Sequence, residues 1–171
     1  MQFNHDNMTG ARLAAHLVGL VPEWSGSRVQ RALAAHDIRR PELDDRAVAE
    51  LLGWTLVVRE VFAATSVADT CAAVNRLLQQ GTRTAYLSTH DGRRPHLHFT
   101  PEDDDLVGRV RSVTAGGLAL FVVEAEGRRL GLCARPGCPR AFVDTSRNGT
   151  RRYCSARCGN AVAVARHRDR P

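Results

Sequence analysis

Four of the five cysteines lie close together in the last part of the chain, in two pairs. Four residues separate Cys133 from Cys138, three separate Cys154 from Cys158, and fifteen lie between the pairs. Such spacing is typical of zinc sites, because a tetrahedral Zn²⁺ takes four soft ligands. Four thiolates leave no open position for water or substrate. The spacing therefore predicts one structural zinc ion and argues against a catalytic one.

Disulfides, or four unrelated thiols, are the alternative interpretations of these cysteines. The chain begins without the charged and apolar regions of a secretory signal. No segment is expected to reach the roughly 18–20 uninterrupted apolar residues of a membrane helix. We therefore expect a cytoplasmic protein with no membrane partner, in which thiols stay reduced and metal binding is favoured over disulfides. The fifth cysteine, Cys71, is predicted to be a buried small apolar side chain on a helix.

The basic residues are distributed as unevenly as the cysteines, and all of them are arginine. Residues 1–132 hold 15 Arg against 16 Asp and Glu, whereas residues 133–171 hold nine Arg against two Asp. Guanidinium groups form bidentate contacts with phosphate and guanine, so double-stranded DNA is the expected partner of this segment. A solvated basic face and a patch for an acidic protein partner are the alternatives. The expected DNA contacts are Arg147, Arg151, Arg152, Arg157, Arg166 and Arg168.

The segment around the cysteines reads as three short elements. Pro136 and Gly137 allow the first cysteine pair to form a tight knuckle. Residues 141–144 and 151–153 flank Asn148-Gly149, a strong hairpin turn signal. A helix is predicted from residue 160 to residue 168, with the second cysteine pair at its start. The order of knuckle, hairpin and helix predicts a small treble-clef-like zinc finger, whose folding depends on the metal.

The preceding residues predict a mostly helical body with one β-hairpin. The expected fold class of the whole chain is therefore mostly α, of the α+β type. Apolar spacing and capping residues predict five helices: at 9–20, from a cap at Ser25 or Ser27 to residue 35, at 45–64, at 66–80, and from about 102 to 125. Gly116-Gly117 is expected to be a weak spot in the last of these helices. Alternation around the Asp91-Gly92 turn predicts the hairpin within residues 85–99. We divide the chain into a body of residues 1–129 and a finger of residues 130–171.

Other side chains in the body give weaker signals. His90, His96 and His98 fall on the same face of the predicted hairpin, expected to point away from the core. They are interpreted as exposed, with a second metal site as the alternative. The acidic run 103–105 is interpreted as helix capping. No nucleotide-binding glycine loop and no nucleophile elbow is found, so the chain is not expected to be an enzyme. An enzyme site in the helical body is the remaining alternative.

The segment around the cysteines resembles the CGNR zinc finger. The resemblance rests on the four cysteines, the segment Phe142-Val143-Asp144, the Asn148-Gly149 turn and Cys158-Gly159-Asn160. This finger occurs at the C-terminus of bacterial proteins whose N-terminal part is the ABATE domain, described as stress-induced transcription regulators. Residues 56–60 and 74–78 are similar to that domain. The resemblance implies a DNA-binding regulator whose body senses a small-molecule effector or forms a homodimer. One departure is Ala161, which stands where the family has an arginine that follows Cys-Gly-Asn.

Overall fold

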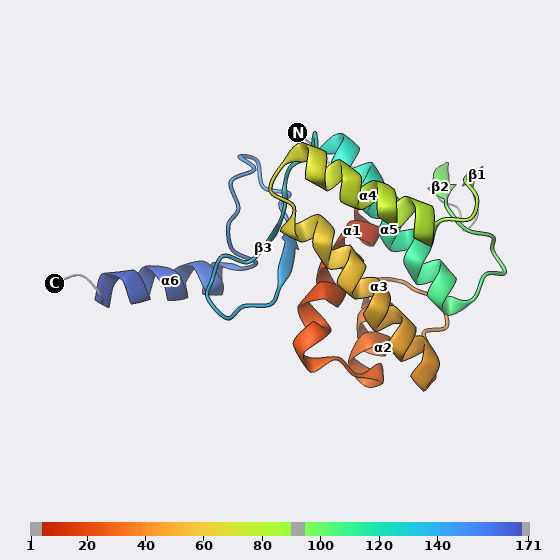
Figure 1. Ribbon diagram of the computed structural model, residues 1–171, viewed down its shortest axis with the longest axis horizontal. Helices are drawn as coiled ribbons and strands as arrows, with labels where there is room; N and C mark the ends of the chain where they lie inside the picture. Colours follow the sequence, from red (N-terminus) through yellow and green to blue (C-terminus); the bar gives the residue numbers. More distant parts are fainter. Residues whose placement is uncertain (1–4, 90–94, 169–171) are drawn as a thin grey trace.

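The computed structural model describes residues 5–89 and 95–168, which form a helical body and a small C-terminal finger (Figure 1). The mostly helical prediction with a small β content is confirmed. The body contains the helices α1 (His5–Leu20), α2 (Gly26–Ala35), α3 (Asp45–Ala63), α4 (Val67–Gly81) and α5 (Leu106–Glu124), the short 3-10 turn η1 (Val21–Glu23), and the strands β1 (Tyr86–Ser88) and β2 (His96–His98). The finger contains β3 (Leu130–Leu132), β4 (Ala141–Val143) and α6 (Ala156–Arg168).

Polar side chains fix where three of the helices begin. The Asp44 carboxylate accepts a hydrogen bond from the Ala47 N–H at 2.7 Å, and the Ser66 hydroxyl accepts one from Asp69 at 3.1 Å. The Asp105 carboxylate caps α5 by accepting from the Gly108 N–H at 2.7 Å. Because Asp105 is the capping residue, α5 begins at Leu106. The predicted start near residue 102 is therefore wrong, whereas the interpretation of the acidic run 103–105 as helix capping is confirmed at Asp105.

Helix α5 lies at the centre of the body and packs against α1, α3 and α4. Its crossing with α1 is close because glycines face each other: a Cβ on Gly117 would lie 2.6 Å from the Gly10 Cα. Gly10 and Gly117 therefore form a packing contact between the two helices. Helix α5 continues through Gly116-Gly117, so the expectation of a weak spot there is wrong. By length and mean hydropathy (19 residues, 1.5) α5 could cross a membrane, contrary to the sequence-based expectation, but more than half of it is buried within the protein.

The predicted β-hairpin is present, but its two faces are exchanged. β1 and β2 pair antiparallel, with Leu87 opposite Leu97 and Tyr86 opposite His98. Both leucines are exposed (69% and 42%), whereas Tyr86, His96 and His98 are half-buried. The Tyr86 and His98 rings stack at 5.1 Å, which gives this face its packing. The expectation that the histidines point away from the protein is therefore wrong; His90 and the Asp91-Gly92 turn lie outside the described residues.

The finger does not stand apart from the body, because its strands complete the main core. β3 pairs antiparallel with β4, and β4 contacts α1 and α3. Ala141 and Val143 are buried in the same cluster as Met8, Val61 and Phe121. Helix α6, in contrast, projects away from the helical body (Figure 1). The first cysteine pair, Cys133 and Cys138, thus lies in the connection between two strands that the body holds in place.

Candidate metal centre

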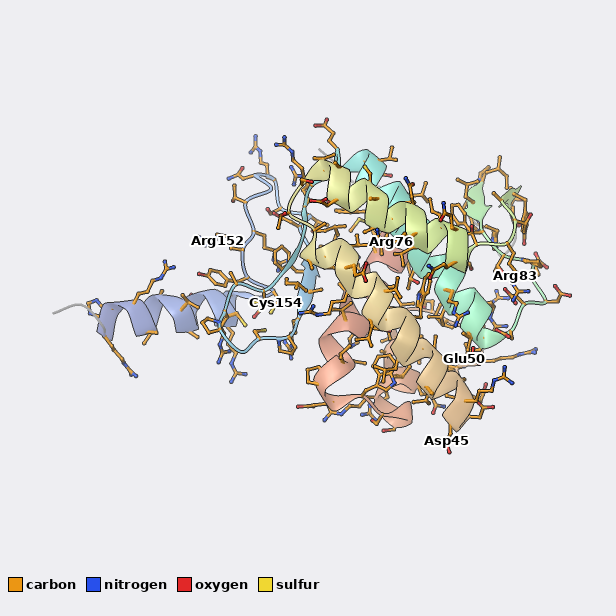
Figure 2. The ribbon with its side chains drawn as sticks, viewed as in Figure 1. Asp45, Glu50, Arg76, Arg83, Arg152 and Cys154 are labelled. Atoms are coloured by element: carbon orange, nitrogen blue, oxygen red, sulfur yellow. The ribbon has the colours of Figure 1, made fainter. Side chains whose placement is uncertain are left out.

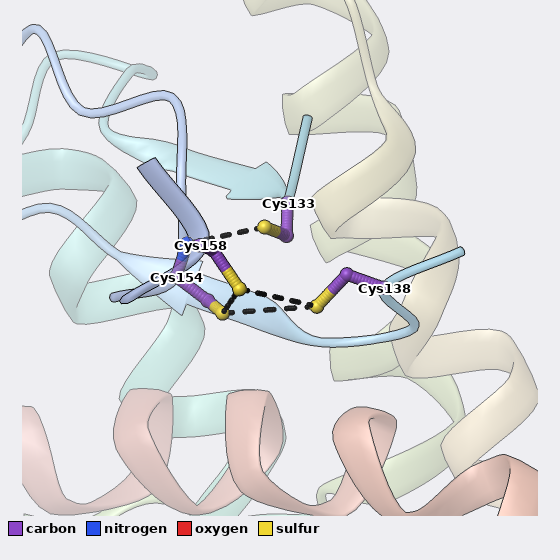
Figure 3. Close-up of side chains that lie close together, drawn as sticks. All are labelled: Cys133, Cys138, Cys154 and Cys158. Atoms are coloured by element: carbon purple, nitrogen blue, oxygen red, sulfur yellow. Dashed lines mark hydrogen bonds between the residues drawn. The ribbon is translucent and has the colours of Figure 1, made fainter. Parts of the chain in front are cut away.

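The four sulfur atoms converge on one point at the junction of β3, β4 and α6 (Figure 3). The Cys138 Sγ lies 3.8 Å from the Cys154 Sγ and 3.9 Å from the Cys158 Sγ, and the last two are 3.6 Å apart. All four sulfurs lie within 4.8 Å of one another. A tetrahedron with Zn–S bonds of about 2.3 Å requires sulfur separations of about 3.8 Å. The donor set therefore suits one structural zinc ion, and the separations exceed the length of a disulfide.

Backbone hydrogen bonds of the finger aim the cysteines at this point. Cys133 follows β3 directly, and its N–H donates to the Arg140 carbonyl at 2.9 Å. The knuckle closes when the Cys138 N–H donates to the Arg135 carbonyl at 3.1 Å, and Gly137 takes the left-handed conformation (φ +73°) that this turn requires. Cys158 lies in the first turn of α6, as predicted for the second pair.

Hydrogen bonds make the Cys158 thiol much more acidic than the thiols of Cys138 and Cys154. The bond to Ser155, followed by that to Arg135, lowers the pKa of Cys158 to about 6. Burial, followed by the bonds to the neighbouring thiols, raises the pKa of Cys154 to about 12. Burial also raises the pKa of Cys138. A metal ion must therefore displace protons from the Cys138 and Cys154 thiols, and its binding weakens as the pH falls.

Asp144 organises the loop between β4 and the second cysteine pair. Its buried carboxylate accepts from the N–H groups of Ser146 at 2.9 Å and Arg151 at 2.8 Å. Burial opposes its ionisation, but these bonds and the nearby Arg129 outweigh burial and hold its pKa below the usual value. Residues 151–153 form no strand, so the predicted hairpin across Asn148-Gly149 is wrong. Hydrogen bonds to the Asp144 carboxylate, rather than pairing between two strands, hold this loop.

Arg151 is a structural side chain rather than a free cation. Its guanidinium donates to the carbonyls of Val143 at 3.2 Å, Tyr153 at 3.1 Å and Cys154 at 3.2 Å, and it lies over the Phe142 ring. It therefore ties β4 to the segment that carries the second cysteine pair. The sequence does not distinguish Arg151 from the neighbouring arginines, because its guanidinium is bound by backbone carbonyls, which every residue carries.

The other five predicted DNA-contact arginines are exposed, but they do not share one face. Arg147 and Arg152 lie in the loop before α6, and Figure 2 shows Arg152 far from the acidic Asp45 and Glu50 of the body. On α6, Arg157 and Arg168 are about three turns apart and point the same way, whereas Arg166 is about half a turn off that line. Ala161, at the position of the family arginine, is half-buried.

Two of the weaker candidates are also placed by the structure. Cys71 is exposed, because the buried side of α4 is formed by Thr70, Ala73, Val74 and Leu77, so the prediction of burial is wrong. The Nε2 atoms of His96 and His98 lie 2.9 Å apart. Among the described residues, no cluster of three or more metal-ligating side chains includes either histidine.

Residues 129–171 match the family model of the CGNR zinc finger. This match covers the finger alone, and it agrees with the convergence of the four cysteines. The C-terminal segment is therefore a zinc-finger module with four cysteine ligands. No curated protein matches the chain.

Proposed function

We propose that the protein is a DNA-binding transcription regulator, in which the finger contacts duplex DNA and the body senses a small molecule or forms a homodimer. The observation that carries this proposal is the charge of the finger surface. Among the described residues of the finger, Asp144 is the only carboxylate, and it is buried. The arginines Arg135, Arg140, Arg147, Arg152, Arg157, Arg166 and Arg168 are all exposed.

Helix α6 supports duplex DNA over a single strand as the ligand. Its 13 residues span about 20 Å and project from the body, and a helix of this kind fits the major groove. Single-strand binding relies on exposed aromatic side chains. In the finger, Phe142 is buried and Tyr153 is half-buried. The proposal assigns no catalytic step to the chain, and it treats the body as the ABATE-like partner of the finger.

The test is a salt titration of binding to a fluorescent genomic DNA fragment, measured by anisotropy. Binding that releases counterions weakens linearly on logarithmic axes, with a slope of about 0.9 per phosphate contacted. Replacing Arg157 and Arg168 by Gln should therefore reduce the slope by about two units. The matched control replaces Arg31 and Arg59, which are exposed on α2 and α3, and should leave the slope unchanged.

Two results would count against DNA binding: a flat salt response of the wild-type protein, or an equal loss in the test and control variants. The acidic-partner alternative would then be favoured. It predicts an interaction that survives nuclease treatment and is lost in Arg152→Glu. Arg151→Glu is unsuited to this comparison, because its guanidinium holds the finger together.

A further inference from the structure

A groove of about 840 Å³ opens on the body, well away from the metal centre. It lies between the start of α1, the loop that joins α2 to α3, the segment from β2 to α5, and α5 itself. The close contact of Gly10 with Gly117 forms part of its lining. Its volume falls in the range of sites that hold small organic molecules.

The lining combines apolar side chains with nitrogen-bearing polar ones. Ile38, Phe99, Val113 and Leu120 provide apolar surface from three different segments. Arg109 adds a guanidinium at the start of α5, and His96 and His98 add imidazoles from β2. Such a lining suits a molecule with an apolar body and one polar end.

Backbone carbonyls hold the Arg109 side chain in place, and among the described residues it forms no ion pair with a carboxylate. Its guanidinium donates to the Asp104 carbonyl at 3.0 Å and the Arg39 carbonyl at 3.1 Å, which bridges two walls of the groove. Its Nε–H is buried and has no acceptor in the described part of the chain. The Asp104 carboxylate is occupied instead by Thr100 and Arg83.

The acidic side chains of the lining do not compensate this charge. Asp37 and Glu102 line the groove, but both are exposed to solvent, where water screens them. Arg109 is only partly exposed, so its field toward the groove is screened less. The site therefore favours a negative charge at the end of a ligand that lies near Arg109.

We propose that this groove binds one small organic anion with an apolar body, and that Arg109 pairs with its anionic group. The inference deepens the ligand-sensing part of the proposed function. It is tested on the zinc-loaded full chain without DNA, so that either proposal can fail alone.

The probe is 8-anilinonaphthalene-1-sulfonate, an apolar fluorescent anion, and its comparison is N-phenyl-1-naphthylamine, the same skeleton without the sulfonate. The wild-type protein should bind the anion saturably at one site and more tightly than the neutral compound. Arg109→Met should weaken anion binding about tenfold or more, with the neutral compound changed less than about twofold. Arg59→Met, on the exposed side of α3, should bind both probes as the wild type does.

A second variant covers the case in which Arg109→Met does not fold, which circular dichroism reports. Leu120 is half-buried in the lining, and Leu120→Trp would fill the groove without removing a charge. It should lose both probes. The inference is overturned if no saturable anion site exists, if Arg109→Met binds the anion as tightly as Arg59→Met, or if Leu120→Trp binds both probes normally.

Discussion

Two glycine-to-alanine substitutions in helices should change stability in opposite directions. Gly53 is exposed within α3 and has nothing within 4 Å of an added Cβ. Gly53→Ala should therefore stabilise the protein by about 0.5–1 kcal/mol, the difference in helix propensity. At Gly117, an added Cβ would lie 2.6 Å from the Gly10 Cα and 2.9 Å from the Ala11 nitrogen. These are backbone atoms, which cannot move aside as a side chain would.

The close contact should outweigh the propensity gain in Gly117→Ala. Overpacking of a core costs about 1–3 kcal/mol, so we expect a net loss of about 0.5–2 kcal/mol. In a domain of this size, 1 kcal/mol shifts the melting temperature by about 2–4 °C. Urea and thermal denaturation of the zinc-loaded protein, followed by circular dichroism, measure both variants against the wild type. If Gly117→Ala is stabilised as much as Gly53→Ala, the α1–α5 contact is not as close as described.

Three further predictions concern the metal, the finger and pH. Purified protein should contain about one zinc per chain, Cys154→Ser should lose it, and metal analysis showing full zinc in that variant would contradict the site. Arg151→Met should destabilise the finger by about 1–2 kcal/mol in urea denaturation, whereas Arg152→Met should change stability by less than about 0.5 kcal/mol; equal effects would remove the structural role of Arg151. Burial, then Arg140, lowers the pKa of His16, and burial, then His16 itself, lowers that of His36. Below about pH 6.5 the histidines bind protons more readily in the unfolded chain than in the folded protein. The free energy of unfolding should therefore decrease as the pH is lowered. Replacing both histidines by Gln should flatten this fall between pH 7.5 and 5.5, and an unchanged slope would refute it.

The sequence is most informative where local chemistry decides the structure. Asp44 and Ser66 cap the helices that are predicted at 45–64 and 66–80, and such capping involves residues only three apart. The four cysteines are equally predictable, since zinc imposes its own geometry on ligands that are far apart in the chain.

Elsewhere the outcome depends on packing between distant segments. Alternation predicts two faces for the hairpin, but not that Leu87 faces solvent while His98 stacks on Tyr86. The β3 strand could not be predicted, because its residues pair with β4 on the far side of the knuckle. Nor does the sequence show that Arg151 is bound internally while Arg152 is exposed; that difference arises from the carbonyls around it.

The insertion of β4 beside α1 sets the order in which the chain can fold during synthesis. Helix α1 leaves the ribosome early, but the side chains of Ala141 and Val143 that cover it belong to a strand made much later. Until then, apolar positions on α1 such as Val18 lack part of their cover, as in other incompletely assembled cores. The contact is long-range in the chain and therefore slow to form. Nascent protein should consequently expose these apolar positions of α1 until β4 has been made.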